Sequence, residues 1–132
     1  MHMRFDPIEG LSAMIIDAVM SSEDMPKDEA LLFKLRLAVE EAVENIVNYA
    51  YNDKAGYLEA DTFVKDGVLS IVLRDAGVPF NPLDKEDPDI TLSAEDRPIG
   101  GLGIFLCKKL MDSVEYEFVN GCNKLTIRKR IS

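Results

Sequence analysis

The stretch LRLAVEEAVENIVNYAY, from Leu35 to Tyr51, carries the strongest structural signal in the chain. Its apolar residues recur at the three- and four-residue intervals that place side chains on one face of a helix. This apolar stripe consists of Leu35, Val39, Ala42, Ile46 and Ala50, with Ala38, Val43 and Val47 beside it. Glu40 and Glu44 fall on the solvent side. The pattern predicts one long amphipathic helix whose stripe packs into the core.

A second band of side chains runs along the edge of the same predicted helix. Its members stand at positions i, i+4, i+7 and i+8 and are Glu41, Asn45, Asn48 and Tyr49. Asparagine is a poor residue inside a helix, because its side chain competes for backbone hydrogen bonds. Two interpretations follow. Either the two asparagines bridge to a neighbouring loop, or they hold a ligand.

Length and charge limit the functions open to this chain. Its 132 residues correspond to one domain, 1–132, with a single hydrophobic core. The formal net charge of −9 repels phosphate backbones and anionic lipid, so we expect neither direct nucleic-acid binding nor membrane binding. No apolar run reaches about 18 residues and no signal pattern opens the sequence, which predicts a cytoplasmic protein.

The cysteine and histidine content argues against two kinds of site. Cys107 and Cys122 are too few and too isolated for a disulfide framework. His2 is the only histidine, which excludes a zinc site built from Cys and His. A metal ion in this protein would therefore need oxygen ligands.

The remaining pattern predicts two further helices and two β-hairpins. Asp66-Gly67 and Asn120-Gly121 are typical two-residue hairpin turns. The expected strands cover residues 1–5, 57–65, 68–75, 114–119 and 124–131, and the expected helices cover about 6–20, 26–51 and 100–112. This order predicts an α+β fold, a two-layer sandwich of a mixed, mostly antiparallel sheet with helices on one face.

Strand alternation places Asp75 on the same side as the apolar residues of its strand, and therefore toward the core. A buried carboxylate is unstable unless hydrogen-bond donors surround it. Asp75 either caps the turn at Gly77 or accepts a hydrogen bond from a ligand amine.

Residues 77–99 form the one long irregular segment, with four of the six prolines and an acidic run. A loop of this length is usually a lid over a site or is disordered. It leads into IGGLGIF, Ile99 to Phe105, where glycines before a helix let the backbone approach an anionic ligand. The segment matches neither the Walker pattern nor the dinucleotide-binding pattern.

Three segments in a fixed order resemble the N, G1 and G2 boxes of the GHKL ATPases, which share the Bergerat fold. They are EEAVENIVNYAY at 40–51, DAGVPF at 75–80 and GGLGIFLCKKLMD at 100–112. The resemblance covers nearly the whole chain and is strongest to the anti-sigma-factor serine/threonine kinases, which are small stand-alone versions of the domain.

The resemblance implies a role for each matching residue. Asn45 would coordinate a Mg2+ ion that bridges the phosphates of ATP, and Glu41 would be the general base of phosphoryl transfer. Asp75 would accept a hydrogen bond from the adenine amino group, and Gly77 would give room for the ring. The other nucleotide-binding positions would be Asn48, Gly101, Leu102 and Gly103, with residues 82–99 as the ATP lid.

Two departures from the family pattern concern the catalytic and adenine positions. Serine kinases of this group often carry an arginine just before the phosphate loop, where this chain has Ile99, and Arg97 is the nearest substitute for a catalytic role. The late-strand threonine of the adenine site has no clear match, because alternation turns Thr126 to the opposite face from its two apolar neighbours.

The resemblance also implies a function. It predicts an ATP-dependent protein serine/threonine kinase that acts as an anti-sigma factor in a partner-switching circuit and phosphorylates a serine of an antagonist. The implied partners are a sigma factor and an antagonist of the STAS (sulfate transporter and anti-sigma antagonist) type, and the implied assembly is a homodimer. The alternative is a non-catalytic binding module in which ATP only orders the lid and partner surface.

Overall fold

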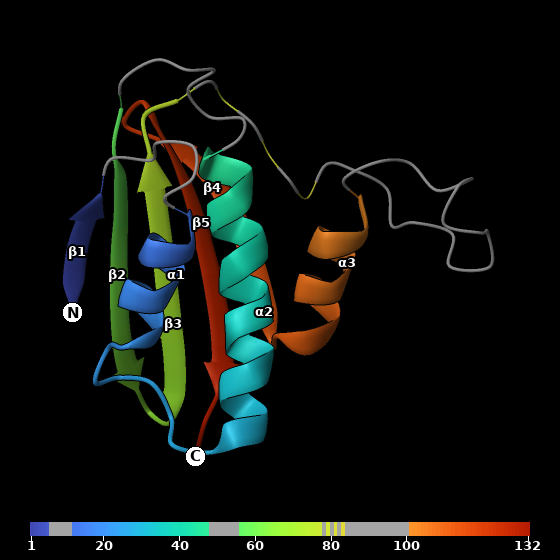
Figure 1. Cartoon of the computed structure of the whole chain (residues 1–132). Coiled ribbons are helices and arrows are strands. Elements are labelled where there is room, and N and C mark those ends of the chain that lie inside the picture. Colours follow the sequence, from blue (N-terminus) through green and yellow to red (C-terminus); the bar gives the residue numbers. More distant parts are fainter. Residues whose placement is uncertain (6–11, 48–55, 78, 80, 82, 84–100) are drawn as a thin grey trace.

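Five strands and three helices form two layers (Figure 1). The structure is a computed structural model and describes residues 1–5, 12–47, 56–77, 79, 81, 83 and 101–132, with the backbone alone for 101–104. In chain order the elements are β1 (His2–Phe5), α1 (Ser12–Met20), α2 (Glu29–Asn45), β2 (Leu58–Lys65), β3 (Val68–Asp75), α3 (Gly101–Leu110), β4 (Ser113–Val119) and β5 (Cys122–Arg130). None of the helices in this part of the chain is long and apolar enough to cross a membrane.

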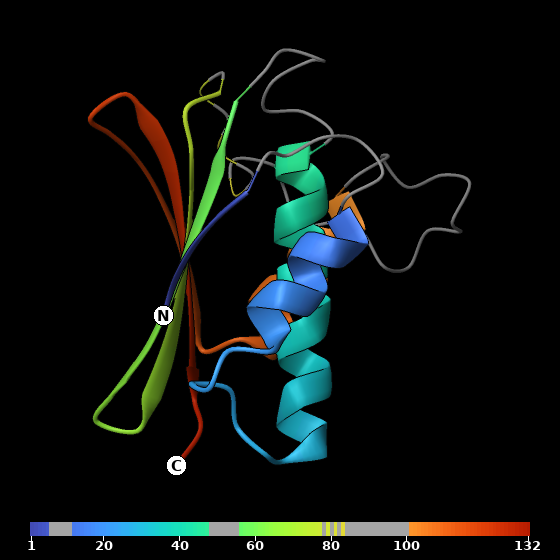
Figure 2. The same cartoon turned by 60° about the vertical axis from the view of Figure 1, so that its left-hand side comes forward.

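The strands form one sheet in the order β1-β2-β3-β5-β4, and each of these pairs is antiparallel. All three helices cover the same face of the sheet, and the described residues leave the other face open (Figure 2). Both expected hairpin turns are present. Asp66 and Gly67 have φ values of 53° and 78°, and Asn120 and Gly121 have 55° and 77°, as a two-residue turn of this kind requires. The predicted α+β sandwich is confirmed.

Helix α2 occupies the middle of the helical layer, between α1 and α3 (Figure 1). The predicted stripe is buried as far as the structure describes it, to Ile46: Leu35, Ala38, Val39 and Val43 have no exposed surface. They form one core with the inner face of the sheet, including Leu69, Ile71 and Leu73 of β3. Full burial of each large aliphatic side chain contributes about 1.5–3 kcal/mol to the stability of the fold. Helix α2 therefore contributes most of the apolar packing between the two layers.

The start of α2 differs from the prediction. The helix begins at Glu29 rather than at Pro26, because Asp28 is its N-cap. Asp28 has extended backbone, with φ −66° and ψ 121°, and its carboxylate accepts from the Leu31 amide at 3.0 Å. Pro26 lies in the preceding connection, where the Met25 amide donates to the Ser22 carbonyl at 3.1 Å.

The C-terminal end of α2 and the start of β5 also bear on the site. α-Helical geometry stops at Asn45, and the next two residues, 46–47, have π-helical geometry, which is frequent at functional sites. The expected continuation over 48–51 lies outside the described residues. Strand β5 begins at Cys122 rather than at Lys124, because a two-residue turn allows Cys122 to pair at once with Val119.

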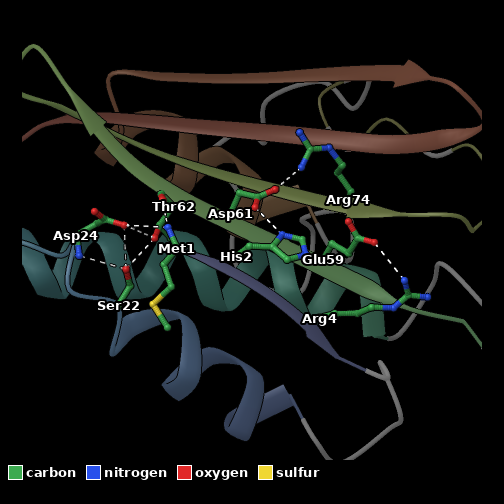
Figure 3. A network of polar contacts seen from close by, with 9 residues as sticks. All are labelled: Met1, His2, Arg4, Ser22, Asp24, Glu59, Asp61, Thr62 and Arg74. Atoms are coloured by element: carbon green, nitrogen blue, oxygen red, sulfur yellow. Dashed lines mark hydrogen bonds and ion pairs between the residues drawn. The ribbon is translucent and has the colours of Figure 1, made fainter.

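Ion pairs on the open face attach the edge strand β1 to the sheet (Figure 3). His2 Nδ1 lies 2.6 Å from Asp61 Oδ1, and Asp61 also pairs with Arg74 on β3. Arg4 Nη1 lies 3.4 Å from Glu59 Oε1. These pairs join β1, β2 and β3, so they stabilise the edge of the sheet rather than the hydrophobic core.

The connection between α1 and α2 is fixed to the inner face by a small polar cluster (Figure 3). The buried Thr62 hydroxyl donates to Asp24 Oδ2 at 2.7 Å and lies 2.7 Å from the Ser22 hydroxyl. This cluster satisfies the buried hydroxyl group of Thr62 on β2 beneath the connection.

Candidate nucleotide site

Three of the predicted site segments lie at the same end of the molecule. Figure 1 shows that the C-terminal end of α2, the C-terminal end of β3 and the beginning of α3 lie at the end opposite the Asp66-Gly67 turn. The first carries Glu41 and Asn45, the second Asp75, and the third begins at Gly101. Segments far apart in the sequence are therefore brought to one end of the sandwich.

Glu41 and Asn45 are one turn apart on α2, and both side chains are half-buried. Burial raises the pKa of Glu41 above its ordinary value, and the nearby charges of Glu44 and Glu40 raise it further. A carboxylate with a raised pKa is a stronger base, which suits proton transfer near neutral pH. The pair combines a base with a carboxamide oxygen on one helix flank.

Helix α3 approaches Glu41 through Cys107. This thiol is 1% exposed, and burial followed by the charge of Glu41 raises its pKa to about 12. Cys107 is therefore a neutral thiol in the contact between α2 and α3. It contributes low polarity to the surroundings of Glu41.

Asp75 is 3% exposed and points to the inner face, as predicted. Its Oδ1 accepts from the Gly77 amide at 3.0 Å and from Asn123 Nδ2 at 2.9 Å. Burial raises the pKa of Asp75, and these two hydrogen bonds offset only part of the effect. The turn-capping interpretation is confirmed, and the cap leaves the carboxylate at the end of the sheet where the other site segments meet.

Asn123 is a site residue that the sequence interpretation missed. The sequence pattern begins the return strand at Lys124 and so leaves Asn123 outside it. In the structure it is the direct cross-strand partner of Asp75. The available signal was the Asn120-Gly121 turn, since a two-residue hairpin fixes the register and directs Asn123 to the inner face.

Comparison with known proteins decides the family. Residues 11–129 match the histidine kinase-like ATPase domain. The chain belongs to this family. The match confirms the resemblance to the GHKL ATPases, and it covers every segment described above except β1 and the end of β5.

Curated relatives of this ATPase domain are named for regulatory functions. The anti-sigma F factor of Geobacillus kaustophilus is 26% identical over 137 residues, covering 100% of this chain and 92% of the relative. The anti-sigma F factor of Clostridium kluyveri is 24% identical over 123 residues, covering 93% and 85%. The serine-protein kinase RsbW of Bacillus cereus is 34% identical over 85 residues, covering 61% and 53%.

The other predicted positions of the ATPase domain are only partly described. Gly101, Leu102 and Gly103 form the first turn of α3, of which the structure gives the backbone. Asn48, Arg97 and the expected lid, 82–99 apart from Leu83, lie outside the described residues. Thr126 faces the open side of the sheet, in register with Val72 and Glu115, as alternation predicted.

The oxygen ligands available at this end of the sandwich suit a hard cation that takes most of its ligands from phosphate. Within the described ranges no group of three or more His, Cys, Asp or Glu side chains could hold a metal ion. The Asn45 carboxamide is an oxygen donor on the same flank as Glu41. Mg2+ is commonly held in this way, by few protein oxygens together with substrate phosphates.

Proposed function

We propose that this chain is an ATP-dependent protein serine/threonine kinase that acts as an anti-sigma factor in a partner-switching circuit. The observation that carries the proposal is Glu41, a half-buried carboxylate of raised pKa one helical turn before Asn45. Membership in an ATPase-domain family supports ATP as the ligand. The names of the relatives support serine as the acceptor and a sigma factor as a partner.

The proposed nucleotide site uses the end of the sandwich described above. Asp75 accepts a hydrogen bond from the adenine amino group, and Gly77 gives room for the ring. The backbone amides at Gly101, Leu102 and Gly103 face the phosphates at the start of α3, where the helix dipole favours an anion. Asn48, Arg97 and the lid at 82–99 complete the site in this proposal.

The proposed reaction is transfer of the γ-phosphate to a serine of a STAS-type antagonist. The serine oxygen bonds to the γ-phosphorus while the bond from that phosphorus to the β–γ bridging oxygen breaks, and Glu41 takes the serine proton. A Mg2+ ion held by Asn45 and the phosphates would supply charge neutralisation. The domain would work as a single unit over 1–132, as a homodimer that binds the sigma factor.

Substitution of Glu41 by glutamine tests the kinase proposal. Glutamine keeps the size and hydrogen-bonding capacity of the side chain but takes no proton. We expect phosphate transfer to a candidate antagonist to fall roughly 10²–10⁴-fold, while ATP affinity stays within a few fold. Phosphate transfer is assayed with labelled ATP, in buffer with Mg2+ and again with EDTA. Calorimetry measures the affinity for ATP.

Glu29→Gln is the matched control, because Glu29 is exposed on the same helix and is not among the charges that raise the pKa of Glu41. It should transfer phosphate as the wild type does. Transfer by Glu41→Gln at the wild-type rate would exclude Glu41 as the base. A wild-type chain that binds ATP and partner but phosphorylates nothing would establish the non-catalytic binding module instead.

A further inference from the structure

A buried row of hydrogen bonds crosses three strands at the proposed nucleotide end of the sheet. Asn123, 6% exposed, lies on β5 between Asp75 on β3 and Tyr116 on β4. Its Nδ2 donates to Asp75 Oδ1 at 2.9 Å and lies 3.5 Å from the Gly77 carbonyl oxygen. The Tyr116 hydroxyl donates to Asn123 Oδ1.

The direction of this row follows from the chemistry of its members. An ionised carboxylate only accepts hydrogen bonds, so Asn123 must present its NH2 group to Asp75. The carboxamide oxygen then faces Tyr116, which must donate its hydroxyl proton. Tyr116 thus fixes the orientation of the Asn123 amide, and Asn123 fixes the plane of the Asp75 carboxylate.

Both donors that the structure describes at Asp75 reach the same oxygen, Oδ1. Both are also neutral, an amide side chain and a backbone amide. A cationic partner would neutralise the carboxylate and compete with a ligand, whereas neutral donors orient it and leave its negative charge in place. The arrangement therefore assigns Oδ2 to an incoming donor.

We propose that Asn123, supported by Tyr116, is a positioning residue that holds Asp75 as a fixed acceptor and so selects a purine with an exocyclic 6-amino group. This inference rests on the proposed function, which places adenine at Asp75. It goes further in giving base selectivity to two residues that do not touch the base themselves. The proposed role depends on the pairing of β3 with β5, which places Asn123 directly opposite Asp75.

The test compares ATP with purine riboside 5′-triphosphate, which is ATP without its 6-amino group. Binding is measured by calorimetry on the full chain, for the wild type, Asn123→Leu and Tyr116→Phe. Asn123→Leu should weaken ATP binding roughly five- to tenfold, the value of one buried hydrogen bond. It should leave the affinity for the analogue unchanged, so the preference for ATP over the analogue falls by the same factor. Tyr116→Phe should do the same more weakly, by roughly two- to fivefold.

Thr126→Val is the matched control, because Thr126 is buried on the same strand but faces the opposite side of the sheet. It should keep the wild-type preference. A wild-type chain that binds both nucleotides equally, or neither, overturns the placing of adenine at Asp75, and this inference with it. The positioning role alone is overturned if the wild type prefers ATP and the variants keep this preference. It is also overturned if the variants lose affinity for both nucleotides equally. If Asn123→Leu does not fold, Tyr116→Phe decides between these outcomes.

Discussion

Asp75 and Asp61 are carboxylates on neighbouring strands that face opposite sides of one sheet. Asp61 lies on the open face, between the side chains of His2 and Arg74. Burial alone would raise the pKa of Asp61, but the hydrogen bonds and charges of His2 and Arg74 outweigh burial and lower it. Asp75 lies on the helix-covered face with two neutral donors, and burial raises its pKa.

The difference shows how the surroundings of a carboxylate can separate a structural role from a binding role. Asp61 has its charge neutralised within the protein, and its effect is to hold β1 and β3 to β2 (Figure 3). Asp75 is a buried carboxylate whose two partners in the described part of the chain are neutral, and burying a carboxylate in this way is costly for the folded protein. That cost is expected where an acceptor must be kept for a ligand, and it supports the proposed role of Asp75.

Of the two aspartates, Asp75 is expected to give the larger effect when it is replaced by asparagine. Asp75→Asn removes the charged acceptor and gives an amide that can also donate to the guanine carbonyl. We expect the preference for ATP over GTP to fall roughly ten- to a hundredfold, from the value of a hydrogen bond to a charged group. Asp61→Asn should leave that preference unchanged. Calorimetry with both nucleotides measures it, and equal preferences in wild type and Asp75→Asn would remove Asp75 from the adenine site.

A smaller effect, on stability and its pH dependence, is expected at Asp61. The folded protein lowers the pKa of Asp61 from its ordinary 3.8, so its stabilisation is complete above that value and is lost as pH falls through the lowered pKa. Asp61→Asn should therefore reduce the free energy of unfolding by about 1 kcal/mol at neutral pH. The difference from wild type should shrink as the pH falls below 3.8. Urea denaturation across this range measures it, and a difference that is constant with pH would refute the ion-pair explanation.

The smallest effect is expected at Glu59, the next outward-facing residue on β2. Its contact with Arg4 is 3.4 Å long, and the Arg4 side chain is 63% exposed. Exposed pairs of this kind contribute little, so Glu59→Gln should change the free energy of unfolding by less than about 0.5 kcal/mol. The same urea titration tests this. A loss as large as that of Asp61→Asn would mean that the whole open face acts as one charge network.

Local patterns were sufficient for much of the fold. The stripe from Leu35 to Ile46 needed only helical periodicity, and both hairpins followed from their Asp-Gly and Asn-Gly turns. The inward direction of Asp75 followed from strand alternation. The start of α2 was predicted wrongly, because Pro26 and Asp28 both suit a helix start and only the backbone geometry shows which one caps it.

The sequence by itself determined the elements, the flank that joins Glu41 to Asn45, and the motifs of the ATPase domain. All of these depend on residues close together in the chain, where periodicity and turn chemistry act directly. The contact between Asp75 and Asn123 spans 48 residues, and the charge of Glu41 acts on the pKa of Cys107, which lies on a different helix. Only the tertiary structure decided these relations, because the sheet places β5 beside β3 although they are not consecutive in the chain, and α3 packs against α2. Burial at that junction, which no local pattern sets, is also what raises the pKa of both Asp75 and Glu41.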